Sequence, residues 1–272
     1  MPFFIGSRGR IHHEAWLPDG GHVERVVVLL HGYGEHLGLY DALARRLTAD
    51  GGAVHAMDAL GHGRSDGERA VLDWDVYVDD ARQLTNLVRD RYPGRPVNLI
   101  GHSAGGLAGY LLAVRSPGIA DALVLSGAPL RRQAWVEAEL AGPQDPEASF
   151  ADPSEVLSTH PAYVHALLHD PLTWHGGFRR ETLQAIVRVW PEAAAGLAAG
   201  LPEVPVLFVH GEDDPVVPVG DARASAAQLP RAHVVTFAGD LHDVLNESDR
   251  DAVHDAVAAF VTASVGVTTG RP

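Results

Sequence analysis

One serine lies between glycines where a strand-like run meets a helical pattern. Residues 99–106 read Leu-Ile-Gly-His-Ser-Ala-Gly-Gly and continue the run that starts at Pro96. Glycine at such a place indicates a sharp turn or close backbone packing. In a Gly-x-Ser-x-Gly turn between a strand and a helix, the strained serine backbone exposes its hydroxyl above the sheet. We therefore identify Ser103 as a candidate nucleophile; the alternative is a bystander serine in an ordinary glycine turn.

A serine hydroxyl is a weak nucleophile and needs a neighbouring base. Where this turn carries the nucleophile, an acid and then a histidine follow along the chain. His242 follows the strand-like run at 234–237 and is the candidate base, whereas His233 opens that run and His254 lies in a helical stretch.

Two adjacent aspartates follow the strand-like run at 206–209. Asp214 precedes a proline, which biases it towards an extended conformation and fixes its direction. We favour Asp214 as the acid that orients the histidine, and Asp213 remains the alternative.

The glycine-rich stretch at 31–36 reads His-Gly-Tyr-Gly-Glu-His and follows the first long strand-like run. Glycines there let backbone N–H groups face an incoming carbonyl oxygen. We predict an oxyanion hole made by the backbone N–H groups of Tyr33 and Ala104, the second directly after the serine. His31 is interpreted as a packed, hydrogen-bonded side chain, and the loop at 61–65 as structural.

The residue types give no indication of a metal or an organic cofactor, and we predict neither. Cysteine is absent, which excludes disulfides, thiolate metal sites and cysteine nucleophiles. The histidines at 31 and 36 do not match a helical zinc-binding pattern.

Short apolar runs alternate with helical patterns along most of the chain. This alternation predicts an α/β fold with a mainly parallel sheet covered by helices on both faces. The predicted strands are 26–30, 53–57, 97–100, 122–125, 206–209 and 234–237, and the main predicted helices are 40–49, 76–91, 104–115 and 251–265.

Residues 131–200 interrupt this alternation. They hold six prolines, helical patches at 134–141 and 180–189, and no convincing strand. So long a stretch between core strands predicts an inserted helical cap rather than a loop. The predicted organisation is a core at 1–130, a cap at 131–200 and a second core part at 201–272. Possible cap walls for an acyl chain are Trp135, Val136, Leu140, Leu167, Leu168, Trp174 and Phe178.

The chain of 272 residues carries a formal net charge of −14 and contains no lysine. Such an acidic protein is a poor partner for nucleic acid or an anionic membrane surface. The apolar run at 1–6 is too short for a signal peptide, and no stretch approaches the ~20 apolar residues of a membrane span. We expect a cytoplasmic protein that acts on a small neutral acyl ester or lipid and touches a lipid surface transiently through the cap.

Three motifs together resemble the monoacylglycerol lipase and lysophospholipase branch of the α/β-hydrolases. They are H-G-Y-G-E-H at 31–36, G-H-G-R-S-D-G-E-R at 61–69 and G-H-S-A-G-G at 101–106. The segments D-P-L at 170–172 and L-H-D-V-L-N-E at 241–247 are similar too. The resemblance covers roughly residues 20–262 and implies the α/β-hydrolase fold and a serine hydrolase of carboxylic esters. It also implies that the acid is the aspartate of G-x-x-D, which here is Asp214.

The sequence departs from this family at one position. Family members carry an arginine just before the tyrosine that follows G-E-H, where it shapes the polar end of the pocket; here Leu39 occupies that place. The resemblance makes Glu35 and Leu39 the candidate substrate-binding residues. The function it implies is cleavage of monoacylglycerol or lysophospholipid through an acyl-enzyme. The alternatives are a short-chain carboxylesterase, a peptidase or amidase, and a binding protein on a hydrolase scaffold.

Overall fold

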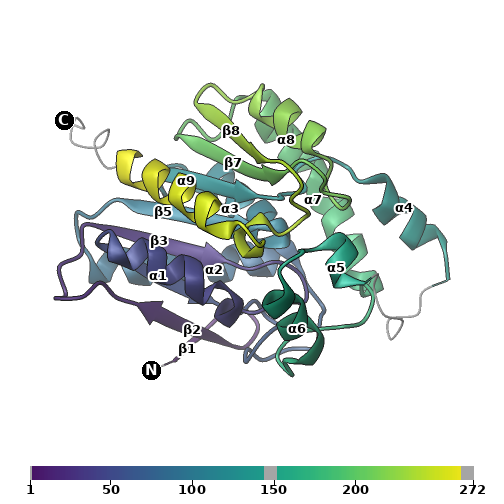
Figure 1. Ribbon diagram of the computed structural model, residues 1–272, viewed down its shortest axis with the longest axis horizontal. Helices are drawn as coiled ribbons and strands as arrows, with labels where there is room; N and C mark the ends of the chain where they lie inside the picture. The colour runs from purple at the N-terminus through teal and green to yellow at the C-terminus, as the bar shows by residue number, and fades with distance from the viewer. Residues whose placement is uncertain (1, 144–151, 265–272) are drawn as a thin grey trace.

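A computed structural model describes residues 2–143 and 152–264 of the chain. Within these ranges eight strands form one sheet in the order β1-β2-β4-β3-β5-β6-β7-β8 (Figure 1). The first two strands pair antiparallel, and β3 to β8 run parallel to one another. The strands are β1 (Phe3–Ile5), β2 (Arg10–Trp16), β3 (Arg25–Leu30), β4 (Gly52–Met57), β5 (Val97–His102), β6 (Ala122–Ser126), β7 (Val206–Gly211) and β8 (Ala232–Phe237).

The central strands are mainly apolar because helices cover both faces of the sheet. Every residue of β3 to β7 is buried. One face is covered by α1 (Asp41–Ala49) and α9 (Arg250–Ala263), and the other by α2 (Trp74–Arg91), α3 (Ser103–Arg115) and α8 (Val219–Ala226) (Figure 1). The predicted layered α/β architecture is confirmed.

Four helices lie in the described part of the chain between β6 and β7, and we call this stretch the α4–α7 segment. It contains α4 (Ala134–Ala141), α5 (Pro153–Val156), α6 (Pro161–His169) and α7 (Arg180–Ala198). These helices lie towards the carboxyl ends of the parallel strands (Figure 1). In the described part of this stretch there is no strand, as the sequence predicts. None of the helices described in the chain is long and apolar enough to cross a membrane.

The helix α7 is longer than the predicted patch at 180–189. It continues through Pro191, which removes one backbone hydrogen bond and normally ends or kinks a helix. Trp190 and Ala193, on either side of the proline, are buried in the core. Burial of this face therefore maintains the helix where local preference alone predicts its end.

Two N-terminal strands were not predicted. β2 reads R-I-H-H-E-A-W, and its mixture of buried and exposed positions does not resemble the apolar core strands. It pairs antiparallel with β4, which gives that strand its second neighbour. Residue 1, residues 144–151 of the predicted cap and residue 265 of the predicted last helix lie outside the described residues.

Candidate active site

The serine turn forms where β5 passes directly into α3. Ser103 has a φ of +48°, a left-handed conformation that is strained for any residue other than glycine. Its glycine neighbours are needed for close packing: a Cβ on Gly101 would lie 2.3 Å from the carbonyl oxygen of Gly105, and one on Gly105 would lie 2.2 Å from that of Leu30. The backbone thus holds the serine hydroxyl at the edge of a cavity.

Three side chains from different loops form a hydrogen-bonded chain at this turn. His242 Nε2 lies 2.9 Å from Ser103 Oγ, and His242 Nδ1 lies 2.9 Å from Asp214 Oδ2. An ionised carboxylate only accepts hydrogen bonds, so Nδ1–H donates to Asp214 and Nε2 accepts from the serine hydroxyl. The structure therefore brings together the three residues that the sequence nominates, in the geometry of a nucleophile, a base and an orienting acid.

The choice between the two adjacent aspartates follows from their surroundings. Asp214 is buried, and its Oδ1 accepts from the N–H groups of Val216 and Val217 at 2.8 and 2.9 Å. Asp213 is exposed, and among the described residues it is Asp214 rather than Asp213 that forms the hydrogen bond with His242 Nδ1.

A second histidine supports the same carboxylate. His210 Nε2 lies 3.1 Å from Asp214 Oδ2 and 2.7 Å from the carbonyl oxygen of Val217. Burial by itself raises the pKa of Asp214, but the charges and hydrogen bonds of His242 and His210 outweigh it and hold the pKa well below its usual range. Sequence analysis missed His210; its position four residues before the acid is the available signal.

The two candidate oxyanion donors line the cavity beside the serine. No described residue accepts a hydrogen bond from the Tyr33 N–H. Ala104 is in the first turn of α3, where N–H groups lack acceptors within the helix. Both donors are therefore available to an incoming oxygen.

Glu35 and Leu39 have different surroundings. Glu35 lines the cavity, but it also fixes the loop of the first candidate donor, because its Oε2 accepts from the Gly32 N–H at 2.7 Å. Leu39 is not among the cavity-lining residues; it packs against the core cluster under α1 and α9. Leu39 lies in the short 3₁₀ turn η1 (Leu37–Tyr40), and its assignment as a substrate-contacting residue is corrected because its side chain packs against the core instead of lining the cavity.

The cavity has a volume of about 130 Å³ and combines a polar end with apolar walls. Glu35, His102, Ser103 and His242 contribute to the polar end. Five of the predicted cap residues line the walls, but Val136 and Leu140 do not; these two pack into the core instead. The apolar wall residues are Trp74, Pro129, Trp135, Pro153, Leu157, Leu167, Leu168, Trp174, Phe178, Ile186, Val216 and Val217.

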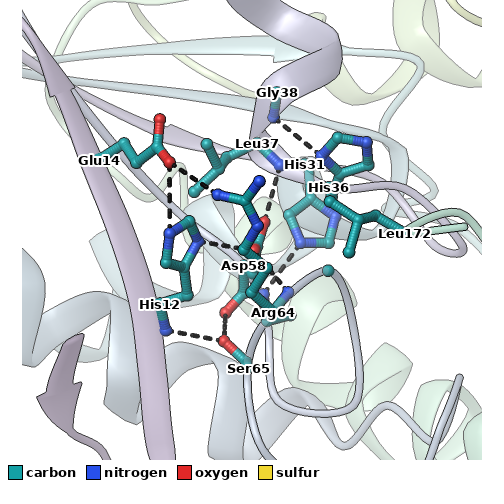
Figure 2. A network of polar contacts seen from close by, with 12 residues as sticks. His12, Glu14, His31, His36, Leu37, Gly38, Asp58, Arg64, Ser65 and Leu172 are labelled. Carbon is teal, nitrogen blue, oxygen red and sulfur yellow. Dashed lines mark hydrogen bonds and ion pairs between the residues drawn. The ribbon is translucent and has the colours of Figure 1, made fainter. Parts of the chain in front are cut away.

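A buried carboxylate that sequence analysis did not identify, Asp58, holds several loops together near the site (Figure 2). It accepts from the backbone N–H groups of Leu37 and Arg64 and contacts His12 Nδ1 at 2.8 Å. Ser65 Oγ donates to the backbone carbonyl oxygen of Asp58. The loop at 61–65 is thus structural, as predicted. The available signal for Asp58 is its place directly after β4.

His31 has the contacts expected of the packed, hydrogen-bonded side chain that the sequence predicts. His31 Nε2 accepts from the Ala59 N–H at 2.9 Å, and its Nδ1–H donates to the carbonyl oxygen of Gly32 at 2.7 Å. Burial lowers the pKa of His31 to about 4, so the ring is neutral near pH 7. His254 Nε2 contacts the carbonyl oxygen of Leu245.

A second polar cluster contains Asp243, the residue that directly follows the candidate base. Tyr163 of α6 places its hydroxyl 2.6 Å from Glu35 Oε1 and 2.6 Å from Asp243 Oδ2. Glu35, His102 and Asp243 have ligand atoms close enough to surround an ion, and no other such group occurs in the described ranges. The Tyr163 hydroxyl contacts one oxygen of each carboxylate, whereas the buried Asp243 Oδ1 has no hydrogen-bond partner in the described structure and lies 3.8 Å from His102 Nδ1.

Comparison with known proteins places this geometry in a family. The family model described as serine aminopeptidase, S33, matches residues 21–249. The chain belongs to this family. Among curated relatives, the monoacylglycerol lipase of Mycolicibacterium smegmatis is 33% identical over 274 residues, covering 96% of each chain. The monoglyceride lipase of Rattus norvegicus is 34% identical over 203 residues, covering 70% of this chain and 67% of that protein.

Solved structures agree with the family assignment. The monoacylglycerol lipase of Paleococcus ferrophilus is 25% identical, with a TM-score of 0.75 over 93% of this chain and 99% of that chain. A structure described as "Lipase (Open form)" has a TM-score of 0.83 at 24% identity, over 97% of this chain and 98% of that chain, which shows the fold alone. The predicted α/β-hydrolase fold and the resemblance to its monoacylglycerol lipase branch are confirmed.

Proposed function

We propose that this chain is a serine hydrolase that cleaves monoacylglycerols into glycerol and a fatty acid. The observation that carries the proposal is the continuous chain of hydrogen bonds from Ser103 through His242 to Asp214, with both contacts at 2.9 Å. The curated relatives named above, which are lipases of this substrate class, support the choice of ester.

The geometry accounts for each proton in the reaction. His242 Nε2 takes the proton of Ser103 as Oγ attacks the ester carbonyl, while Asp214 stabilises the resulting imidazolium. The Tyr33 and Ala104 N–H groups donate to the oxyanion. The imidazolium then protonates the leaving glycerol oxygen, and the C–O bond breaks to give the acyl-enzyme. Water attacks that ester after losing a proton to His242, and Ser103 regains its proton as the fatty acid leaves.

We infer that the α4–α7 segment is a cap over the acyl-binding cavity. Helices α4, α6 and α7 supply Trp135, Leu167, Leu168 and Ile186 to its walls. An apolar cavity of about 150 Å³ accommodates benzene, so the 130 Å³ found here suits an acyl segment of similar size. Longer chains then extend to the cavity mouth at Leu168, which is 44% exposed.

The alternatives differ in what the polar end must bind. A short-chain carboxylesterase uses the same serine but little of the apolar wall. A peptidase is suggested by the description of the matched family model, which names an aminopeptidase. An aminopeptidase must bind the ammonium group of its substrate, and Glu35 is the only carboxylate among the described residues that line the cavity. Both oxygens of Glu35 already contact protein groups, namely the Gly32 N–H and the hydroxyl groups of Tyr40 and Tyr163. A neutral ester with hydroxyl groups fits this end best.

Hydrolysis of monoacylglycerols and p-nitrophenyl esters across acyl lengths tests the proposal. Each methylene buried in the cavity is worth ~0.8 kcal/mol, so kcat/KM should rise roughly fourfold per methylene until the cavity is full. Ser103→Ala should abolish turnover while the protein stays folded. Substantial residual hydrolysis by the variant, or cleavage of amides in preference to esters, would contradict the proposed mechanism.

A further inference from the structure

The Tyr163 hydroxyl makes two short contacts, one with Glu35 and one with Asp243, but it has only one proton to donate. The Tyr163 oxygen lies 2.6 Å from an oxygen of each carboxylate. Contacts of this length between oxygens are hydrogen bonds and require a proton each. A tyrosine hydroxyl carries one proton. The second proton must therefore belong to one of the two carboxyl groups.

The other contacts assign that proton to Glu35. Its Oε2 already accepts from the Tyr40 hydroxyl and the Gly32 N–H, whereas Oε1 contacts Tyr163. Asp243 Oδ2 accepts from the side-chain amide of Asn246 at 2.9 Å, as an ionised carboxylate does. The resulting order is Glu35 O–H donating to Tyr163, and Tyr163 O–H donating to Asp243.

The titratable groups that face Glu35 come from every element packed against it. They are Tyr40 of η1, Tyr77 of α2, His102 at the end of β5, Tyr163 of α6 and Asp243 after β8. Burial, followed by the charge of Asp243, raises the pKa of Glu35 to about 7. The surroundings therefore favour the protonated carboxyl that the hydrogen-bond count requires.

The cluster joins the proposed cap to two loops of the candidate active site. Glu35 fixes the Gly32 N–H, directly before the candidate oxyanion donor Tyr33. Asp243 directly follows the candidate base, and its N–H donates to the carbonyl oxygen of Leu157 at 2.8 Å. Tyr163 supplies the bridging hydroxyl from α6.

We propose that one proton shared by Glu35, Tyr163 and Asp243 fastens α6 to the loops of the candidate base and oxyanion donor. Loss of this proton leaves two carboxylates around one hydroxyl, so one of the two 2.6 Å contacts breaks and α6 loosens. The inference goes beyond the proposed function and does not depend on Ser103 being the nucleophile.

Infrared spectroscopy on the Ser103→Ala protein tests the proton directly. A protonated carboxyl has a carbonyl stretch that is separate from the carboxylate bands. At about pH 5.5 we expect this band from two buried acids, because the pKa of Glu35 and that of Asp240 are both raised to about 7. Glu35→Gln should remove the Glu35 component and leave the Asp240 component. The absence of the band, or a band intensity that is the same in the Ser103→Ala protein with and without Glu35→Gln, would overturn the proposal.

Hydrogen exchange of the α6 amides tests the mechanical consequence. After correction for intrinsic rates, exchange should be roughly tenfold faster at about pH 8.5 than at about pH 5.5, because a buried hydrogen bond is lost. In Glu35→Gln the side-chain amide of the glutamine donates an N–H in place of the shared proton. The protection of the α6 backbone amides should therefore not change with pH. Where that variant fails to fold, Asp243→Asn gives the same test from the other side of Tyr163.

Glu247 provides a matched control on the same part of the chain. It is also buried, but its Oε2 accepts from the N–H and hydroxyl of Thr159 and needs no proton of its own. Glu247→Gln should therefore loosen the start of α6 equally at both pH values. If the exchange rates of the α6 amides do not change with pH in the wild-type protein, or still change with pH in Glu35→Gln, the shared proton is contradicted.

Discussion

At the scale of single residues, neighbouring aspartates have very different environments. Asp214 contacts His242 and His210 and is buried, whereas Asp213 is exposed one position away. Asp214→Asn should place an amide beside His242 Nδ1 and disturb the tautomer that the reaction needs, which costs on the order of 10⁴ in kcat in a comparable triad.

Asp213→Asn is the matched control for this experiment, because it removes the same charge at nearly the same place. Its kcat should stay within about twofold of the wild-type value. Steady-state kinetics with one monoacylglycerol decides the assignment. Equal losses in the two variants would show that charge in the loop, rather than the orienting hydrogen bond, is what matters.

Glu35 also has a consequence for stability. Its pKa rises from 4.5 in the unfolded chain to about 7 in the fold, chiefly through burial. The native state therefore holds a proton that the unfolded state releases between these pH values, and the free energy of unfolding should fall as pH rises through this window. The difference corresponds to roughly 3 kcal/mol.

Glu35→Gln should make this dependence less steep between about pH 4.5 and pH 7. The part that remains belongs to Asp240, whose pKa is also raised to about 7, chiefly through burial. Urea denaturation across the window measures the effect. Glu181→Gln, at an exposed position of α7, should retain the wild-type slope. A wild-type stability that rises through this window without a Glu35-dependent component would contradict the expected effect.

At the scale of elements, α6 contributes one hydroxyl that contacts both active-site loops. Tyr163→Phe removes it and leaves two buried carboxyl groups without that partner. Because both loops lose support, kcat should fall about tenfold, with a smaller change in KM.

Tyr110→Phe is a suitable control for the loss of a buried hydroxyl. Tyr110 of α3 does not line the cavity; its hydroxyl donates to the carbonyl oxygen of Leu201 at 2.9 Å and lies 3.3 Å from that of Ala193. This variant should lose stability and keep its kcat. Melting temperatures of both variants measure the loss of stability, and steady-state kinetics measure the loss of kcat. Equal kcat losses in the two variants would contradict a role of Tyr163 in positioning the active-site loops.

The sequence predicts elements well where burial and local pattern agree. The strands β3 to β7 are apolar at nearly every position, so their existence follows from composition alone. Local pattern fails where packing overrides it, as at Pro191 within α7, or where a strand is polar, as in β2.

The site shows the same division. Ser103, Asp214 and His242 each follow a recognisable strand, so the sequence nominates them. The contacts of Glu35 with Tyr163 and Asp243 join positions separated by 128 and about 208 residues, and no local motif links α6 to either loop. Leu39 illustrates the opposite error, because its place in a motif does not make it a cavity-lining residue.

At the scale of the whole molecule, charge should determine which lipid surface the protein approaches. The formal net charge is −14, and an anionic bilayer repels it within a Debye length. Co-sedimentation should be stronger with zwitterionic vesicles than with anionic vesicles, and added salt should reduce the difference. Leu168→Asp should weaken binding to both; unchanged binding would contradict contact through the proposed cap.

The contacts of the α4–α7 segment limit how this protein can be re-engineered. Leu157, Thr159 and Tyr163 of the segment bind the loop at 241–247, and the Trp174 N–H donates to the carbonyl oxygen of Gly34 in the other loop. A chimaera that imports another helical insert to change substrate range therefore also removes the supports of the core loops. We expect grafts that keep Glu35, the loop at 241–247 and Tyr163 of α6 together to retain activity.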